Sequence, residues 1–284
     1  MSAPDDISAA LARMEALSRP GKARPAAASP GGVPHTYLGL TRTATYGFLM
    51  AIPLVLAYES LVWLTLRETG VRIGADVWIR GLVMSLGMGG TWPFAVLVAL
   101  LGLVLVGRER HRHGPIPIRR AYLAGMVAES GLWAVAMLFV VSNVVGHLFA
   151  GLGMAGMALG AAPLAQAASG GVGSMPFWGQ IGLSFGAGVY EEFVFRVLLV
   201  GGLAWALRKV WPTGPAYGVA AIVGALIFSG VHYTGALGDA FSPVSFTFRF
   251  LLGLALNGLY LSRGFGVAAW AHALYDVLVT VLQA

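Results

Sequence analysis

The chain has 284 residues, of which 57% are hydrophobic and only 11% are charged, and its mean hydropathy is +0.77. A soluble globular domain carries about 25% charged residues, so the composition excludes an ordinary soluble protein. Several apolar runs are longer than the ~20 residues that a bilayer-spanning helix needs, and the sequence lacks the short alternating segments of a membrane β-barrel. We therefore predict an all-α protein, a polytopic transmembrane helix bundle in which membrane lipid is the main neighbour.

The absence of cysteine excludes disulfides, zinc–thiolate sites and cysteine nucleophiles. The net charge of +6 does not indicate nucleic-acid binding, because basic residues in a membrane protein usually mark its cytoplasmic loops.

Along the chain, residues 1–36 are predicted to be a disordered or amphipathic N-terminal tail, since much of this stretch is rich in Pro, Ala and Gly. Residues 37–170 are predicted to form N-terminal transmembrane helices, and residues 171–284 a second helix bundle that contains the polar motifs described below. About seven membrane segments are expected, at 44–66, 81–107, 121–150, 176–207, 215–234, 245–262 and 265–282. The second, third and fourth are overlong, which predicts tilt, kinks or additional helices at the interface.

The distribution of Lys and Arg predicts the orientation. Thirteen of these 18 side chains fall in the N-terminal tail, at Arg42 just after it, in the loop RERHRHGPIPIRR, at Arg208–Lys209 and at Arg263. Only Arg67, Arg72 and Arg80 fall on the other side. The positive-inside rule therefore places the N-terminus in the cytoplasm of an integral membrane protein, which we expect in the plasma (inner) membrane.

The stretch YEEFVFR, residues 190–196, places two carboxylates and an arginine inside an apolar segment. Intramembrane ionisable residues are candidates for function and normally face the interior of the bundle. Glu192 and Arg196 are spaced i,i+4, which favours an ion pair that lowers the cost of burying both charges. Glu191 points about 100° away on an α-helix, so it is predicted to be a free carboxylate, suited to act as a general base.

Two later segments repeat the i,i+4 spacing with histidine. Phe228 and His232 share one helix face in IFSGVHYTG, and His272 and Asp276 share one in AWAHALYDVL. Asp276 can therefore orient His272 or accept a hydrogen bond from it. Each motif also has a structural interpretation, as a lock or polar clamp between helices.

The remaining polar residues inside the predicted segments have no such pattern. We interpret them as structural, helix-end or interfacial residues: Glu59, Glu129, His147 and Arg249.

The order EExxxR, FxxxH, HxxxN/D resembles the CAAX-protease and bacteriocin-processing family (CPBP, or Abi) of intramembrane endopeptidases, which includes the prenyl-protein endoproteases. The resemblance covers residues 175–282 and includes the glycine-bearing run FRFLLGLALNGLYLSRGFGVAAWAH. It marks the second bundle as CPBP-like and catalytic. Asp276 stands where the prenyl-protein proteases have Asn, and an ionised Asp cannot donate a hydrogen bond to an oxyanion.

The resemblance implies an endopeptidase that hydrolyses a peptide bond in a membrane-associated or lipidated protein or peptide. Glu191 would be the base that activates water, His232 would help to position that water, and His272 with Asp276 would form the oxyanion side. Glu192 and Arg196 would hold the helix and tune the base.

A metal-dependent version of the same site stays open. Glu191, His232 and His272 would then bind zinc with one open position for water. Because the sequence lacks HExxH, we favour a mechanism without a cofactor. Two other classes also stay open, a non-catalytic scaffold or peptide-binding immunity-type protein and a small transporter, although the chain shows no internal repeat of a transporter kind.

Overall fold

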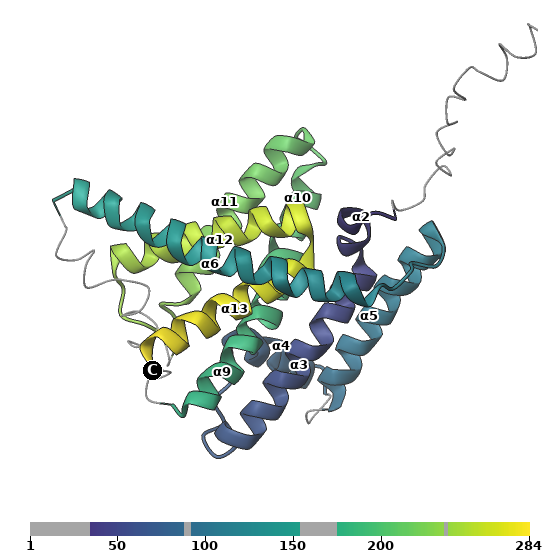
Figure 1. Ribbon diagram of the computed structural model, residues 1–284, viewed down its shortest axis with the longest axis horizontal. Helices are drawn as coiled ribbons and strands as arrows, with labels where there is room; N and C mark the ends of the chain where they lie inside the picture. Colours follow the sequence, from purple (N-terminus) through teal and green to yellow (C-terminus); the bar gives the residue numbers. More distant parts are fainter. Residues whose placement is uncertain (1–34, 88–91, 154–174, 236–237) are drawn as a thin grey trace, which may run out of the picture. The chain divides into compact units, whose positions relative to one another are not determined.

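The computed structural model describes residues 35–87, 92–153, 175–235 and 238–284 (Figure 1). Every regular element in these ranges is helical, which confirms the predicted all-α bundle. Within these ranges, five helices are long and apolar enough to cross a membrane: α3 (Ala44–Leu66), α6 (Arg120–Gly151), α11 (Thr213–Val231), α12 (Pro243–Arg263) and α13 (Phe265–Gln283). The predicted N-terminal tail lies outside the described residues except for its last two positions.

The prediction of one membrane segment at 81–107 is wrong. Helix α4 (Gly74–Ser85) ends there and a separate helix, α5 (Trp92–His113), follows. Gly87 directly after α4 has a φ of +82°, a left-handed conformation that favours glycine and ends a helix. Helix α5 also continues through the first part of the Arg/His-rich stretch that was predicted to be a loop, where cationic side chains suit a helix C-terminus.

The predicted segment 176–207 is one continuous helical run made of three elements. Helix α9 (Phe177–Gly186) passes into a π-helix, η1 (Ala187–Val200), and then into α10 (Gly201–Leu207). The N–H of Gly201 donates to the carbonyl of Arg196, the i→i+5 pattern of a π-helix. The whole YEEFVFR motif therefore lies in a widened helix, a conformation found frequently at functional sites.

Helix α13 lies at the centre of the packing, against α3, α6, α9, η1 and α12 (Figure 1). Two interhelical hydrogen bonds attach it: Trp270 Nε1 donates to the carbonyl of Met50 in α3 at 2.8 Å, and Ser130 Oγ in α6 donates to the carbonyl of Val267 at 3.1 Å. Because lipid tails are as apolar as the helices, such polar contacts and close packing hold a membrane bundle together. The predicted domain division near residue 170 stays a prediction, and its boundary is outside the described residues.

Glycines allow the closest approaches between helices. A Cβ added to Gly188 of η1 would lie 2.5 Å from the carbonyl oxygen of Ala269 and 2.5 Å from the Cβ of Ala273, both in α13. Gly264, with a φ of +84°, makes the tight connection between α12 and α13. Gly188 and Gly264 therefore help to set the position of α13, which carries His272 and Asp276.

A short helix, α2 (Tyr37–Thr41), precedes α3, and its N-cap Thr36 accepts a hydrogen bond from the N–H of Gly39. Helix α3 begins in a similar way: the hydroxyl of Thr43 accepts from the N–H of Tyr46. The carboxylate of Glu109 in α5 also accepts from the N–H groups of Ala44 and Thr45. The start of α3 and the end of α5 therefore lie together.

Candidate active site

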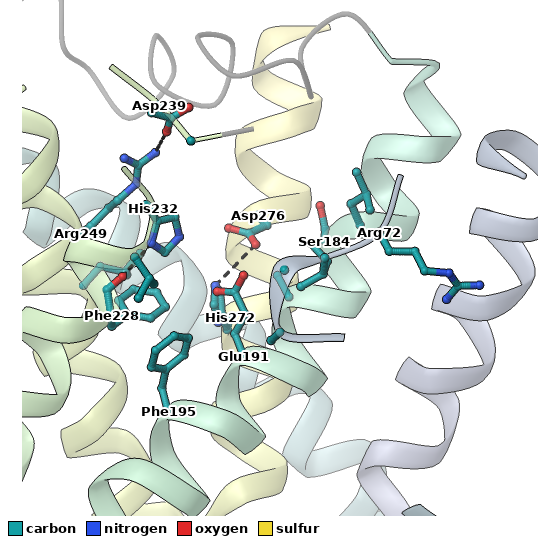
Figure 2. A pocket seen from close by; sticks show the side chains of 18 of the residues that line it. Arg72, Ser184, Glu191, Phe195, Phe228, His232, Asp239, Arg249, His272 and Asp276 are labelled. Carbon is teal, nitrogen blue, oxygen red and sulfur yellow. Dashed lines mark hydrogen bonds and ion pairs between the residues drawn. The ribbon is translucent and has the colours of Figure 1, made fainter. Parts of the chain in front are cut away.

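A cavity of about 590 Å³ collects the polar residues of the second bundle (Figure 2). Its walls come from the α3–α4 connection and α4, from α9 and η1, and from α11, α12 and α13. Four of the six predicted site residues line it: Glu191, His232, His272 and Asp276. The other two, Glu192 and Arg196, are fully buried behind its wall. The folded chain thus brings together motifs that are separated by up to about 85 residues.

The Glu192–Arg196 ion pair is present. Arg196 Nε lies 3.1 Å from Glu192 Oε2, with both side chains at 0% exposure. The contact is an ion pair, and the guanidinium nitrogens have no hydrogen-bond partner in the described part of the chain. Instead the guanidinium carbon of Arg196 lies 4.4 Å from the centre of the Phe228 ring, which adds a cation–π contact.

Glu192 makes a second contact that the sequence did not predict. Its Oε1 lies 2.7 Å from Nδ1 of His272, so one carboxylate joins Arg196 on its own helix to His272 on α13. The close packing at Gly188 makes this distance available. Glu192 is therefore a bridge between the first and third motifs as well as the partner of Arg196.

His272 lies between the carboxylates of Glu192 and Asp276, and Figure 2 shows its contact with Asp276. Its Nε2 is 3.5 Å from Asp276 Oδ2, one turn further along α13, so the predicted His272–Asp276 contact is present. With Nδ1 donating to Glu192, a neutral imidazole would turn its Nε2 lone pair toward Asp276. One proton must therefore lie on Nε2 or on Asp276 for this contact to be favourable. At 3.5 Å the contact is loose, which leaves that proton accessible from the cavity.

Glu191 differs from its neighbour. It lines the cavity and is partly exposed, and no hydrogen bond or ion pair is made by its carboxylate within the described residues. In Figure 2 its side chain points into the space between His232 and Asp276. The two adjacent glutamates are therefore divided into one paired, buried group and one group that faces the cavity.

His232 caps the C-terminus of α11 and lines the same cavity. Its Nδ1 lies 2.7 Å from the carbonyl oxygen of Phe228, which can only accept, so Nδ1 carries a proton in that contact. A neutral His232 then has its lone pair on Nε2, ready to accept a hydrogen bond. The i,i+4 spacing of FxxxH therefore places the carbonyl of Phe228 where it fixes the tautomer of His232.

Two serines near the motifs are occupied in backbone contacts. Ser184 Oγ donates to the carbonyl of Gln180 at 3.0 Å, and Ser229 Oγ donates to the carbonyl of Phe246 at 2.8 Å. Neither hydroxyl contacts a histidine that would activate it as a nucleophile, among the interactions of the described residues.

The structure adds charged residues that the sequence interpretation missed. Arg72 and Arg80 both pair with Asp76, and both also reach Glu59. Burial lowers the pKa of Arg72, but hydrogen bonds to Glu59 and Asp76 outweigh that effect and raise the pKa above its usual value. Arg72 lines the cavity. The i,i+4 ladder at positions 72, 76 and 80 was readable by the same rule that identified the three motifs.

Arg249 was predicted to be an interfacial anchor, and the structure instead places it on the cavity wall. It pairs with Asp239, donates to Ser245 Oγ at 3.0 Å and lies over the ring of Tyr233. Its position on α12, beside the end of α11, is set by tertiary packing, so no local pattern pointed to it.

The remaining intramembrane acids are paired. Glu129 accepts from Arg263 Nε and Nη2 at 2.5 and 2.7 Å and from the hydroxyl of Tyr37 at 2.7 Å, which agrees with its structural interpretation. Glu59 is likewise held by Arg72 and Arg80. His147 is exposed and contacts the carbonyl of Asn143 on its own helix.

The zinc alternative can be compared with the arrangement of its predicted ligands. Within the described residues, His, Cys, Asp and Glu side chains nowhere gather in a group of three that could hold a metal ion. Of the proposed set, His272 has both nitrogens facing carboxylates. The choice between the metal-free and the zinc version of the site stays a prediction.

Comparison with known protein families gives one match. The family model described as "Type II CAAX prenyl endopeptidase Rce1-like" matches residues 173–278, a span that contains all six predicted site residues. This match confirms the predicted resemblance over that part of the chain. Neither the curated proteins nor the solved structures contain a match to this chain.

Proposed function

We propose that this chain, which over residues 173–278 belongs to the Rce1-like CAAX protease family, is an intramembrane endopeptidase. It would hydrolyse a peptide bond in a membrane-associated protein or peptide. The observation that carries the proposal is the division of the two glutamates: Glu192 is buried and paired, whereas Glu191 faces the cavity without a hydrogen-bond partner in the described residues.

In the proposed first step, Glu191 accepts a proton from a water molecule in the cavity. The oxygen of that water attacks the carbonyl carbon of the substrate. The second O–H of the same water stays intact and donates a hydrogen bond to Nε2 of His232, because Nδ1 of His232 already donates to the carbonyl of Phe228. Positioned general bases of this kind contribute about 10²–10⁴-fold to a rate.

In the proposed second step, the developing oxyanion accepts a hydrogen bond from the proton held between His272 and Asp276. Asp276 stands where the prenyl-protein proteases have Asn, and an ionised Asp cannot donate to the oxyanion. In this assignment His272 Nε2 is the donor instead, and Asp276 orients the imidazole ring. Glu192 fixes the ring through Nδ1 at 2.7 Å. The C–N bond then breaks, and Glu191 returns its proton to the leaving amine, which regenerates the carboxylate.

We also propose that the reaction uses the protein's own acids and histidines without zinc. The support is the arrangement of the described residues, in which His, Cys, Asp and Glu side chains nowhere gather in a group of three that could hold a metal ion, while Glu191 faces the cavity. Bound zinc would supply a Lewis acid and an activated water in place of Glu191's role as a base.

The test is cleavage of a peptide library by the purified protein in liposomes, with new termini identified by mass spectrometry. Each reaction would be run with a chelator, with the chelator followed by zinc, and with neither. Cleavage that is unaffected by the chelator supports the proposal. Activity that disappears with the chelator and returns with zinc contradicts the metal-free mechanism. A folded protein that binds peptides and cuts none contradicts the enzyme assignment.

A further inference from the structure

The two ends of the bundle differ strongly in charge. One end, here called the basic end, is where α3, α6, α11 and α13 begin and where α5, α10 and α12 finish. In the described part of the chain it holds nine Lys and Arg side chains: Arg42, Arg108, Arg110, Arg112, Arg119, Arg120, Arg208, Lys209 and Arg263.

Contacts between distant segments show that these residues share one end. Arg42 Nη2 donates to the carbonyl of Leu261 at 3.3 Å, and the backbone N–H of Arg119 donates to the hydroxyl of Tyr46 at 2.9 Å. Glu109 in α5 accepts from the first N–H groups of α3. The starts of α3 and α6 and the ends of α5 and α12 are therefore adjacent.

Helices α11 and α12 connect Arg208 and Lys209 to the same end. Asn257 Nδ2 donates to the carbonyl of Ala221 at 2.7 Å, and Ser229 Oγ donates to that of Phe246 at 2.8 Å. This antiparallel pairing places the start of α11 beside the end of α12. The start of α11 directly follows the Arg208–Lys209 pair, and the guanidinium of Arg208 lies over the ring of Tyr217.

The cavity lies toward the opposite end, here called the pocket end. Its lining comes from the end of α11, the first part of α12, the second half of α13 and the connection after α3. This end holds four arginines in the described residues, Arg67, Arg72, Arg80 and Arg249, and the last three are paired with carboxylates. Positive charge that marks a cytoplasmic face is therefore concentrated at the end away from the cavity.

Helix α4 gives the pocket end an apolar outer surface. Asp76 is fully buried and Arg80 reaches inward to Glu59, while Val77, Leu82 and Met84 are about half or more exposed. An amphipathic helix with its apolar side outward suits the boundary between headgroups and acyl chains. Trp78 of the same helix lines the cavity and contacts Phe195 edge to face. One wall of the cavity is thus a helix whose outer side is apolar.

We propose that the cavity opens on the non-cytoplasmic face of the membrane. Given the proposed endopeptidase function, its substrates are exported polypeptides that remain tethered to the bilayer. A segment that stays in the cytoplasm would meet the basic end of the bundle. A tethered chain that has crossed the membrane would instead bring its cleavage site level with Glu191.

The absence of cysteine makes a direct test of topology available. Thr234→Cys places a thiol at the cavity mouth, where residue 234 is exposed, and Ala240→Cys provides a second, exposed position in the same connection. Ile118→Cys is the matched control at the basic end, where Ile118 is 57% exposed. Each variant would be treated with a membrane-impermeant maleimide on intact bacterial cells and again after the inner membrane is permeabilised.

The expected result is labelling of Thr234→Cys and Ala240→Cys before the inner membrane is opened, and of Ile118→Cys only afterwards. The reverse pattern, or labelling of the pocket-end thiols only after permeabilisation, overturns the proposal. Equal labelling of both ends in intact cells also overturns it, because the chain would then have no single orientation. This readout needs no substrate, so it separates a wrong orientation from a wrong enzyme assignment.

Discussion

Two arginine–carboxylate clusters in this bundle contain the same kinds of charged group and differ in their surroundings. At the basic end, Glu129 accepts from two nitrogens of Arg263 and from Tyr37, and together these groups join α6, α12 and α2. At the cavity, Glu192 and Arg196 form a similar pair. Glu191 beside them faces the cavity, and Nε2 of His272 lies 3.5 Å from the carboxylate of Asp276. A buried charge in a membrane protein therefore indicates function only when it is left available to a ligand.

The largest effect is expected at the available carboxylate. Glu191→Gln keeps the size of the side chain and removes the base, so the hydrolysis rate should fall by about 10²–10⁴-fold. The melting temperature of the purified protein should be nearly unchanged, because the described residues give Glu191 no hydrogen bond or ion pair to lose. Initial rates of peptide cleavage and a thermal-shift assay measure both quantities.

The opposite behaviour, a loss of stability without a loss of rate, is expected at the cluster of Glu129, Arg263 and Tyr37. Glu129→Gln leaves Arg263 buried without its counter-ion, and breaking a buried pair costs about 3 kcal/mol, toward the lower part of the usual range because the Glu129 side chain is 21% exposed. The melting temperature should fall clearly, while the rate per folded molecule stays near that of the wild type. A rate loss as large as that of Glu191→Gln would remove the distinction between the clusters.

A smaller effect is expected from pushing the two motif-bearing helices apart. Gly188→Ala puts a methyl group 2.5 Å from atoms of Ala269 and Ala273, and overpacking of this kind costs about 1–3 kcal/mol. It should also displace His272 from Glu192 and lower the rate about tenfold, by the logic that misplacing a catalytic group is costly.

Gly202→Ala is the control for this change, since a Cβ at Gly202 has no neighbour within 4 Å among the described residues. It should leave the rate and the melting temperature unchanged or slightly raise the latter. If both alanine variants behave like the wild type, the contact between η1 and α13 does not control the site.

The smallest effect is expected from Tyr37→Phe, which removes one of the hydrogen bonds to Glu129. A hydrogen bond to a charged group contributes about 1.5 kcal/mol at the lower end of its usual range. The lower end applies here because Tyr37 is partly exposed and Arg263 still neutralises the carboxylate. A modest drop in melting temperature with an unchanged cleavage rate would agree with the structural interpretation of this cluster. A change in rate would link the basic end to catalysis.

The sequence predicted the helical class, most of the helix positions and the pairs within each motif, because hydropathy and i,i+4 spacing are local properties. The grouping of the three motifs into one site came from the family resemblance. Its failures have physical causes. The break between α4 and α5 depends on a glycine turn inside an apolar run, which hydropathy does not register. The π-helix at YEEFVFR could not be predicted, because the spacing of apolar residues over so short a stretch does not distinguish a π-helix from an α-helix. Arg249 and the second contact of Glu192 arise from helices packing together, and no single helix encodes them.

The comparison of Glu191→Gln with Glu192→Gln, made in one experiment, tests the central claim most directly. For both variants, the cleavage rate per folded molecule and the melting temperature would be measured in the same liposomes. We predict that Glu191→Gln loses the rate alone, and that Glu192→Gln loses both, because it breaks the contacts with Arg196 and His272. If the two variants lose rate and stability to the same extent, Glu191 and Glu192 do not have the separate roles assigned to them.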